Sequence, residues 1–461
     1  MFNNVTSHRT GAAPTLHGHA RIVIVPTVSR TLGAALLATA LLVTAACKRQ
    51  PAPAAGDDAR PAGRDATTAT AIDCRHVAGD DALAAIDRAL TCGAAALARY
   101  QDARGAIAAP TYAAFRDGHA TTALAALALG QAPGTTAASA YRRAIDFVAT
   151  AVGADGRFVT PAPPYPLYVA AIGALALSTP GNERHRAARD ALLGELRRLQ
   201  LGAANGWRPA DVSYGGWGYA ERPPVRPTAA GYDPDRDDER AANLSATLLA
   251  IGALRLAGAT DDDPALVAAR TFVDRCQNRV AACAGEPCPG DGGFVFTPAP
   301  ALRDSNKAGA IEGGPPRSYG TMTADGVRAL LRLGVPPADP RVREAAGWLT
   351  ARFDPASPPG DFPPAAESRR AAGAYYWAWS AAHALHHLGV RDVASAHGPI
   401  AWAPALTWSL LDRQAADGTW RNPATELRED DPVVATSFAM AALAVTRQVI
   451  AGDYRSHAGW K

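Results

Sequence analysis

The string Asp235-Arg-Asp237-Asp238 places three carboxylates within four positions, a density that acid–base catalysis could use. A carboxylic acid that donates a proton to carbon must be held desolvated beside its substrate, because water favours the charged form. The string lies inside residues 232–240, a highly charged segment that precedes an apolar stretch. Charge runs of this kind are typical of solvated loops, and a solvated loop is the interpretation that we favour here.

Three histidines form a second group with possible chemistry. His383, His386 and His387 lie in one stretch that is expected to be helical. His383 and His387 are four residues apart, which is the spacing at which two imidazoles on one helix can ligate a metal. No glutamate or third ligand is evident nearby. Histidines on a helix surface are therefore the interpretation that we favour over a metal site.

Both groups belong to a chain that repeats one structural unit six times. In the sixth and clearest unit, Gln414, Gly418 and Trp420 form a compact turn, and Asp431 with Pro432 begins an apolar helix. Glycine permits the tight backbone, the glutamine amide can bridge backbone groups, and tryptophan can stack over the turn. Aspartate before proline is a strong helix start signal. Each unit is therefore expected to contain a helix, a turn, a variable loop and a second helix.

The aromatic position of this turn is held by Trp217 in the third unit and by Phe294 in the fourth. The second helix of each unit is the more apolar, and these helices are expected within residues 121–129, 169–177, 243–254, 324–333, 383–388 and 431–443. A helix that is apolar on most faces must be buried on most faces, whereas the first helices carry charges and face water on one side. One pair cannot bury its own apolar face, so neighbours must stack and the ring must close. The sequence therefore predicts an all-α (α/α)6 toroid over residues 74–450.

The inner helices are expected to begin at one end of the barrel, so that their first residues share one mouth. Six helix N-termini would bring partial positive charge to that mouth. Polar and aromatic side chains there could line a pocket for a polyol, a glycan or a carboxylated ligand. The alternative is that they are caps and turn fillers. The candidates are Asp117, His119, Tyr165, Tyr168, Asn243, Tyr319, Thr323, Asp325, Tyr376, Trp377 and Asp431.

At its turns the chain resembles the squalene cyclase and prenyltransferase repeat superfamily. Residues 414–420 fit the glutamine–tryptophan motif of that superfamily. Segments 276–294, 318–323 and 430–436 look like its uncharacterised, exported bacterial branch. The resemblance covers residues 85–447 and implies a terpenoid cyclase-like toroid. It carries the fold more strongly than any activity, because one fold hosts many functions.

The resemblance also suggests acid chemistry. Class II terpene cyclases protonate an alkene with the middle aspartate of an Asp-x-Asp-Asp string, a role that would fall to Asp237, with Asp238 beside it. By register, however, the cyclase motif should fall on residues 243–247, where acids are missing. The chain also lacks the Gly-Cys-Gly-Glu-Gln thioester of complement-like relatives.

Protein prenyltransferase β-subunits, in the same superfamily, bind zinc with Asp-x-Cys and a distant histidine. Asp274 and Cys276 fit the first part, and His383 could supply the second. Three residues of common types make a weak motif, and the alternative is that Cys276 is a small, buried apolar residue. We therefore expect neither a metal nor another cofactor.

Residues 1–47 are expected to be a lipoprotein signal peptide outside the fold. Arg30 precedes the apolar run 32–43, which ends in small residues and Cys47, the expected lipidation site. An ordinary signal peptide with an incidental cysteine is the alternative. The basic region is long for such a signal, which indicates a start codon assigned upstream of the true one. Lys48 in place of aspartate favours the outer membrane, facing the periplasm or the cell surface.

Residues 48–73 are rich in Ala, Pro, Gly and Asp and predict a disordered tether, and residues 451–461 predict a C-terminal tail. Export to an oxidising compartment favours disulfides. Cys74–Cys92 would staple the first helix and Cys283–Cys288 would close a loop, although spacing alone does not fix the pairing. The net charge of +3 gives no indication of a nucleic-acid partner.

The sequence thus predicts an exported, lipid-anchored toroid that binds an unidentified small molecule, glycan or protein at the barrel mouth, without cyclase or zinc chemistry. Contact with the membrane would be through the lipid anchor only. The alternative is an enzyme on the same fold, either a terpene cyclase-like isomerase with Asp237 as acid or a polysaccharide lyase or hydrolase. The second of these would use Asp117, His119, Tyr376 and Asp325.

Overall fold

The computed structural model describes residues 73–452, apart from residues 78, 160–162, 164, 238–239, 281–288, 313 and 396–397. The predicted signal peptide, almost all of the tether and most of the predicted tail lie outside the described residues. Cys283 and Cys288 also lie outside them, so their predicted pairing stays a prediction. The described part is built mainly from helices.

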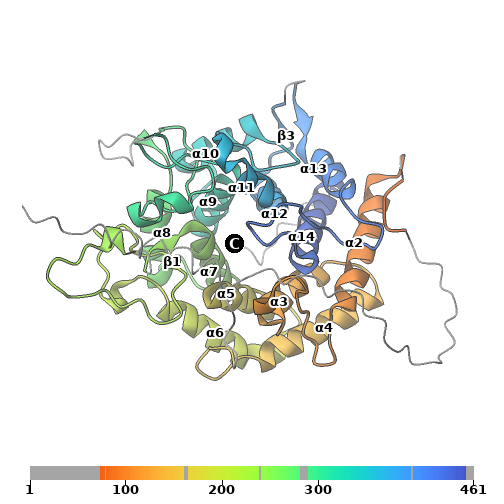
Figure 1. The fold of residues 1–461 in the computed structure, drawn as a ribbon, viewed down its shortest axis with the longest axis horizontal. Coiled ribbons are helices and arrows are strands. Elements are labelled where there is room, and N and C mark those ends of the chain that lie inside the picture. Colours follow the sequence, from red (N-terminus) through yellow and green to blue (C-terminus); the bar gives the residue numbers. More distant parts are fainter. Residues whose placement is uncertain are drawn as a thin grey trace, which may run out of the picture. The chain divides into compact units, whose positions relative to one another are not determined.

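Six helices form an inner ring (Figure 1). They are α3 (His119–Leu129), α5 (Pro166–Leu177), α7 (Leu244–Leu256), α9 (Gly320–Arg332), α12 (Ala374–His387) and α14 (Pro432–Ile450). Each packs against the next in this order, and α14 packs against α3, so the ring closes. The helix α14 is long and apolar enough to cross a membrane, but it is mostly buried within this ring.

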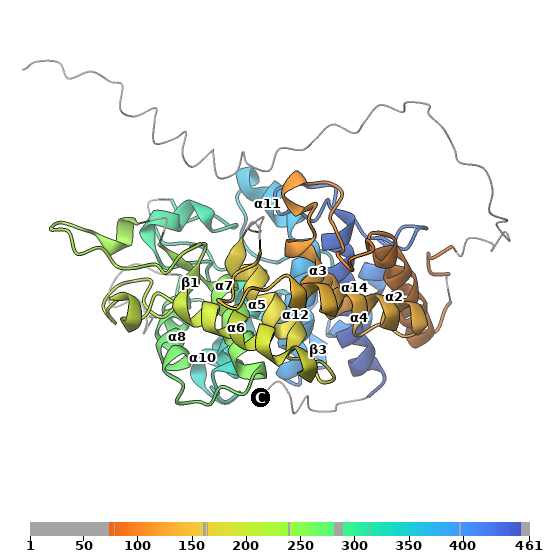
Figure 2. The ribbon, with the colours of Figure 1, turned by 90° about the horizontal axis from the view of Figure 1, so that it is seen from below.

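Six further helices surround the inner ring, as Figure 2 shows from the side. They are α2 (Ala82–Arg99), α4 (Thr135–Thr150), α6 (Arg186–Arg198), α8 (Pro264–Arg275), α10 (Pro340–Arg352) and α13 (Trp402–Leu411). They bury one face each and carry charged residues on the other, as in α6, where Leu192 and Leu196 are buried and Arg197 is exposed. The predicted (α/α)6 toroid is confirmed.

The remaining elements are short and lie in the connections. The helix α11 (Glu367–Ala372) precedes α12, and the 3-10 turns are η1 (Ala113–Phe115), η2 (Glu183–His185), η3 (Ala203–Asn205), η4 (Pro234–Arg236), η6 (Pro300–Ser305) and η7 (Pro364–Ala366). Two antiparallel pairs join β1 (Trp217–Gly218) to β2 (Ala242–Asn243) and β3 (Asp392–Val393) to β4 (Ile400–Ala401). In the first pair Trp217 lies opposite Asn243, which holds the aromatic turn against the start of α7.

The predicted Gln–Gly–aromatic turn is a clasp between neighbouring units. The Gln414 amide donates to the carbonyl of Gly418 in its own turn, at 3.2 Å, and to the carbonyl of Ala89 in α2, at 3.1 Å. The same pair of bonds recurs from three other glutamines, each to its own turn and to the following outer helix: Gln101 to Gly105 and Ala140, Gln200 to Gly215 and Ala265, and Gln277 to Gly292 and Arg341. The sixth clasp therefore joins the last unit to the first.

Gly418 and Trp420 complete this clasp. Gly418 has φ +83°, and a Cβ there would stand 2.7 Å from the carbonyl oxygen of Cys92, so glycine is required both by conformation and by space. The indole of Trp420 is fully buried and donates to the carbonyl of Leu410 at 2.8 Å. Its backbone N–H donates to Thr436 Oγ1 of α14 at 3.0 Å, which ties the turn to the inner ring.

Trp217 and Phe294 occupy the same structural position in their units. Their backbone N–H groups donate to Thr247 and Thr323 of the following inner helices, both at 3.0 Å. Each aromatic turn is thereby fixed to its outer helix by packing and to its inner helix by one hydrogen bond.

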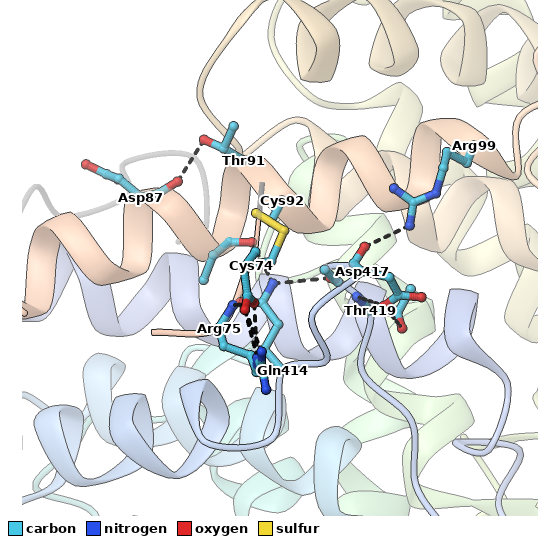
Figure 3. Close-up of a disulfide and its surroundings, with 12 residues drawn as sticks. Cys74, Arg75, Asp87, Thr91, Cys92, Arg99, Gln414, Asp417 and Thr419 are labelled. Carbon is cyan, nitrogen blue, oxygen red and sulfur yellow. Dashed lines mark hydrogen bonds and ion pairs between the residues drawn. A yellow bond between two sulfur atoms is a disulfide. The ribbon is translucent and has the colours of Figure 1, made fainter. Parts of the chain in front are cut away.

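The disulfide Cys74–Cys92 is confirmed and lies beside the ring-closing clasp (Figure 3). Cys74 N–H donates to the carbonyl of Ala416, and Arg99 donates to that of Asp417, so the segment before α2 and the last residue of α2 both meet the last turn. At the same junction between the last unit and the first, Arg447 of α14 forms an ion pair with Asp87 of α2 at 2.5 Å. Covalent and polar contacts therefore reinforce the place where the ring closes.

One inner helix begins earlier than the sequence predicts. The helix α12 starts at Ala374, whereas the apolar helix of this unit was expected within residues 383–388. The carboxylate of Glu429 accepts hydrogen bonds from the backbone N–H groups of Tyr375 and Tyr376, at 3.0 and 2.7 Å. A cap supplied from more than fifty positions along the chain leaves no local start signal, which explains the difference.

Removing the ring-closing clasp should destabilise the fold. In Gln414→Ala two buried carbonyls lose their donor, so we expect the free energy of unfolding to fall by about 1–3 kcal/mol. Urea denaturation followed by circular dichroism would measure this. The exposed Gln131, replaced in the same way, should change the free energy by less than about 0.5 kcal/mol. Equal effects at the two positions would show that the clasp contributes nothing.

Candidate functional site

Contacts between first turns show that the inner helices begin at one end of the ring. Tyr168 of α5 donates from its hydroxyl to Asn243, the N-cap of α7, at 3.0 Å. The first turns of α12 and α14 are joined through Glu429, two residues before Asp431. The residues predicted to share a mouth therefore do lie at the same end, although their side chains take different roles.

Five of the predicted mouth residues brace the helix ends. Asn243 and Asp431 accept bonds from the first backbone N–H groups of α7 and α14 as N-caps. Thr323 accepts the bond from Phe294 described above, and the Trp377 indole donates to the carbonyl of Asp354. Tyr319 is the buried residue before α9. The simpler alternative of caps and turn fillers fits these five.

Asp117 and His119 lie apart from the other candidates. Asp117 accepts a bond from the His119 backbone N–H at 2.8 Å. The His119 imidazole is buried, stacks on Phe147 of α4 at 5.5 Å between ring centroids, and also contacts Phe158. It therefore faces the outer ring, and the structure does not bring it to Tyr376 or Asp325.

Asp325 and Tyr376 are brought together, at the centre of a cluster that three inner helices build. The Asp325 carboxylate is fully buried and accepts a hydrogen bond from the Tyr376 hydroxyl at 2.8 Å. Ser380 of α12 and Ser245 of α7 also donate to it, Ser245 at 3.4 Å, and Arg328 lies 3.4 Å away as an ion-pair partner. We call these five residues the Asp325 cluster.

Burial dominates the electrostatics of this cluster. Desolvation raises the pKa of Asp325, against the opposing effects of Arg328, Ser380 and Tyr376. Desolvation also lowers the pKa of Arg328, which is partly restored by the Asp325 charge. The Arg328 guanidinium lies over the Trp379 ring at 4.4 Å, a cation–π contact that stabilises a cation removed from water.

The cluster belongs to a polar stripe on the axis side of two helices. Asp325, Arg328 and Arg332 are spaced three and four residues apart on α9, so they share one face and extend about 10 Å along it. Desolvation lowers the pKa of His383 on α12, and the nearby Arg328 and His387 lower it further. The histidine that was predicted to lie on a helix surface is thus a neutral imidazole facing two arginines.

Partial exposure of a few inner-helix residues indicates accessible space along the axis, which we call the axial recess. On the inner helices most residues are buried, yet Leu127, Ile172 and Phe438 are partly exposed. Tyr376 and His383 of α12 are partly exposed as well and lie seven residues apart, on one face. Outer helices and neighbours cover the other faces of these helices, so the exposed atoms must face the axis. The recess has an apolar wall from α3, α5 and α14 and a polar wall from α9 and α12.

Asp237, the candidate acid of the sequence, lies in the connection between β1 and β2. Its carboxylate accepts a bond from the Tyr232 hydroxyl at 2.8 Å and pairs with Arg240 at 2.8 Å. Both partners belong to the same connection, so the described contacts of Asp237 lie outside the inner ring. Asp238 lies outside the described residues.

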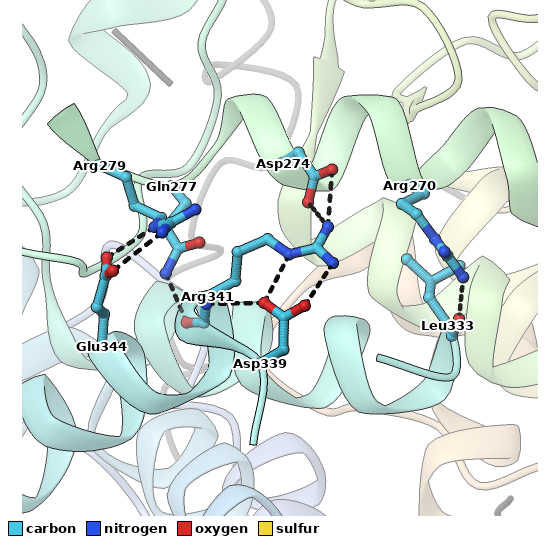
Figure 4. A network of polar contacts seen from close by, with 8 residues as sticks. All are labelled: Arg270, Asp274, Gln277, Arg279, Leu333, Asp339, Arg341 and Glu344. Atoms are coloured by element: carbon cyan, nitrogen blue, oxygen red, sulfur yellow. Dashed lines mark hydrogen bonds and ion pairs between the residues drawn. The ribbon is translucent and has the colours of Figure 1, made fainter. Parts of the chain in front are cut away.

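The zinc candidates Asp274 and Cys276 have other roles in the structure, and Figure 4 shows the partners of Asp274. Asp274 pairs with Arg341 at 2.9 Å, and Arg341 is also held by Asp339. Cys276 is buried at the end of α8, and burial raises the pKa of its thiol far above the usual range, so it stays protonated. Among the residues that the structure describes, no group of three His, Cys, Asp or Glu side chains could hold a metal.

The sequence reading missed several members of the site. Ser245 and Ser380 carry no motif, and they become recognisable only when α7, α9 and α12 are placed side by side. Arg328 could have been found, because Asp325, Arg328 and Arg332 form a charged stripe on a helix predicted to be buried all round. Buried charges in such a helix mark either a partner or a cavity.

Comparisons with known proteins give the chain neighbours of low identity. The apo structure of the type II terpene cyclase MstE from Scytonema matches at 11% identity over 79% of this chain and 99% of that chain, with a TM-score of 0.45. A protein from Actinoplanes matches at 16% over 79% and 99%, with 0.46, and a glycosidase at 17% over 80% and 100%, with 0.44. No family model and no curated protein matches the chain. The exported bacterial branch stays a prediction.

The cap of α12 predicts a pH-dependent difference in stability. Burial raises the pKa of Glu429 from 4.5 to about 7, so the folded protein keeps a proton that the unfolded chain releases between these pH values. The stabilisation that the folded protein gains from this retained proton is fully present below pH 4.5 and is lost as the pH rises through about 7. Glu429→Gln cannot ionise, so the free energy lost by the substitution should be larger at pH 5 than at pH 8, by about 2 kcal/mol.

Urea denaturation of both proteins across this range measures the difference, because all other titrating groups cancel in the comparison. Parallel stability curves for wild type and variant would contradict the raised pKa of Glu429.

Proposed function

We propose that the protein binds a small organic ligand in the axial recess, against the Asp325 cluster. The observation that carries this proposal is a buried, ionisable and hydroxyl-rich cluster beside partly exposed residues of the inner ring. Natural ligand sites combine largely apolar walls with a few convergent polar groups, and this recess has that composition. Binding at this end of the ring agrees with the mouth predicted from the sequence.

The side chains of both walls of the recess are held in position before a ligand binds. Tyr376, Trp379 and Phe438 pack ring against ring, with centroids 5.3–5.6 Å apart, so their orientation is fixed before binding. Ser245, Ser380 and Tyr376 hold the Asp325 carboxylate from three sides. Rigid polar groups that need no reordering reduce the entropic cost of binding.

A second candidate is catalysis with Asp325 as a general acid. It is favoured by the burial that raises the pKa of Asp325, since a carboxyl group that keeps its proton can donate it. The polysaccharide-active alternative would retain Asp325 and Tyr376 but lose His119, which faces the outer ring. A cyclase reaction through Asp237 receives no such support, because that carboxylate is paired with Arg240 in the connection between β1 and β2, outside the inner ring.

The proposal is tested with two consecutive tyrosines of α12 whose hydroxyl groups have different partners. Tyr376→Phe removes the hydroxyl that donates to Asp325, whereas Tyr375→Phe removes one that donates to the carbonyl of Arg421. A thermal-shift panel of neutral saccharides, isoprenoid alcohols and fatty acids is applied to the purified chain. Any ligand found should bind Tyr376→Phe about tenfold more weakly than wild type, because the hydroxyl that orients Asp325 is lost, and Tyr375→Phe normally.

Equal binding by both variants, or no binding from the whole panel, would overturn the proposal. Turnover of a bound compound that disappears in Asp325→Asn would move the conclusion to the catalytic alternative.

We also propose export, with lipidation at Cys47 and an outer-membrane anchor. The disulfide Cys74–Cys92 supports an oxidising compartment, because such bonds persist outside the reducing cytosol. Mass spectrometry of the mature N-terminus should find an acylated cysteine at position 47. A free N-terminus elsewhere, or uncleaved protein, would refute lipidation at this residue.

A further inference from the structure

Three tyrosines form an aromatic surface at the mouth of the recess. Tyr168 of α5 and Tyr219, directly after β1, lie nearly parallel, with centroids 5.9 Å apart and an interplanar angle of 19°. Tyr165 stands across both, with centroids 6.4 Å from Tyr168 and 6.0 Å from Tyr219. We call these three residues the tyrosine platform.

The platform is accessible, yet it lies within the mouth rather than on the outer surface. Tyr219 is 43% exposed and Tyr165 is 38% exposed, high values for large aromatic side chains. Burial nevertheless raises the pKa of the Tyr219 phenol to about 12. Tyr219 directly follows β1 and stacks on Tyr168 in the first turn of α5, which places the platform at the end of the barrel where the inner helices begin.

The backbone at Tyr165 indicates that its position is specifically maintained. Its φ is +55°, in the left-handed region that side chains other than glycine rarely adopt. The following Pro166 begins α5 and fixes the direction of the helix. Strain of this kind persists where the surroundings enforce it, and it places the ring of Tyr165 next to Tyr219.

Hydrogen-bonding groups lie directly beside the platform. The Tyr168 hydroxyl donates to Asn243, and the charge of Asp325 and the phenol of Tyr376 are close enough to Tyr168 to raise its pKa. Aromatic faces and hydroxyl-binding groups thus converge on one place. A hydrocarbon ligand would use the rings but leave the polar groups without a function.

The mouth is also poorly suited to an anion. The N-termini of α7, α12 and α14 could donate to a negative group, but their N–H groups are already taken by Asn243, Glu429 and Asp431. Two of these three caps are acidic. These caps therefore reduce the partial positive charge at three of the six inner helices, and they favour a neutral ligand beside α7, α12 and α14, whereas α3, α5 and α9 have no side-chain cap.

We propose that the ligand is a neutral saccharide. The C–H face of a pyranose ring would stack on Tyr219 and Tyr165, and its hydroxyl groups would reach the Asp325 cluster. This inference rests on the proposed function and adds the class of ligand to it. A sugar ring matches both features because one of its faces is apolar and its edge is rich in hydroxyl groups.

The experiment titrates the intact mature chain with maltohexaose, cellohexaose and chitohexaose by saturation-transfer NMR and calorimetry. At least one should bind wild type at roughly millimolar affinity or better. Tyr219→Ala should weaken that binding about tenfold, and Tyr219→Phe, which keeps the ring, should recover most of it. Val267→Ser, an exposed change on the outer helix α8, is the control and should bind as wild type.

Tyr165→Gly keeps the test valid if Tyr219→Ala fails to fold. Glycine adopts a positive φ without strain, so the melting temperature should stay or rise while saccharide binding falls. Absence of binding by all three oligosaccharides, or unchanged binding in both platform variants, would overturn the inference. Binding of geranylgeraniol that depends on Tyr376, without any saccharide binding, would overturn this inference while leaving the proposed function intact.

Discussion

A single glutamine amide that bonds to two carbonyl groups is the contact on which the ring depends. One carbonyl belongs to the glutamine's own turn and the other to the next outer helix, so each clasp fixes the position of one unit relative to its neighbour. Four units keep this device, whereas Val152 and Asp354 stand at the corresponding positions of the second and fifth units. Because the clasp from Gln414 reaches back to Ala89, the ring closes by the same interaction that propagates it.

Closure determines which surfaces can carry a site. Every outer helix buries one face, and every inner helix packs against two inner neighbours and an outer helix, so within the described residues the inner helices are left with their axial face. The charged residues of an outer helix are explained by their contact with solvent at the outer surface. Polar residues on the axial face cannot be explained in that way. The stripe on α9 therefore needs partners, and Ser245 and Ser380 from the two neighbouring helices provide them.

The fold could be predicted because the residues that define each turn are close together in the sequence. The site could not, because the residues that build it are far apart in the sequence. Gln414, Gly418 and Trp420 stand within seven positions, so the turn and the repeat are visible in the sequence alone. The Asp325 cluster instead joins residues 55 and 80 positions apart, and Glu429 caps a helix 53 positions away. Asp325 and Tyr376 were predicted from their places near helix starts. Asp237 was suggested by an Asp-x-Asp-Asp string, and a loop that is rich in charged residues can contain such a string without any catalytic role.

The polar wall of the recess contains a carboxylate and a guanidinium that pair only at long range. Asp325 is the carboxylate that faces Arg328, and the contact between them is long, at 3.4 Å, because Ser380 and Tyr376 occupy the nearer positions around the carboxylate. Arg328 is consequently stabilised as much by the face of Trp379 as by its counter-ion. A carboxylate surrounded by hydroxyl donors is already adapted to the hydrogen bonds that another hydroxyl would make. A ligand that brings hydroxyl groups therefore extends an existing network, whereas one that brings charge would have to disrupt it.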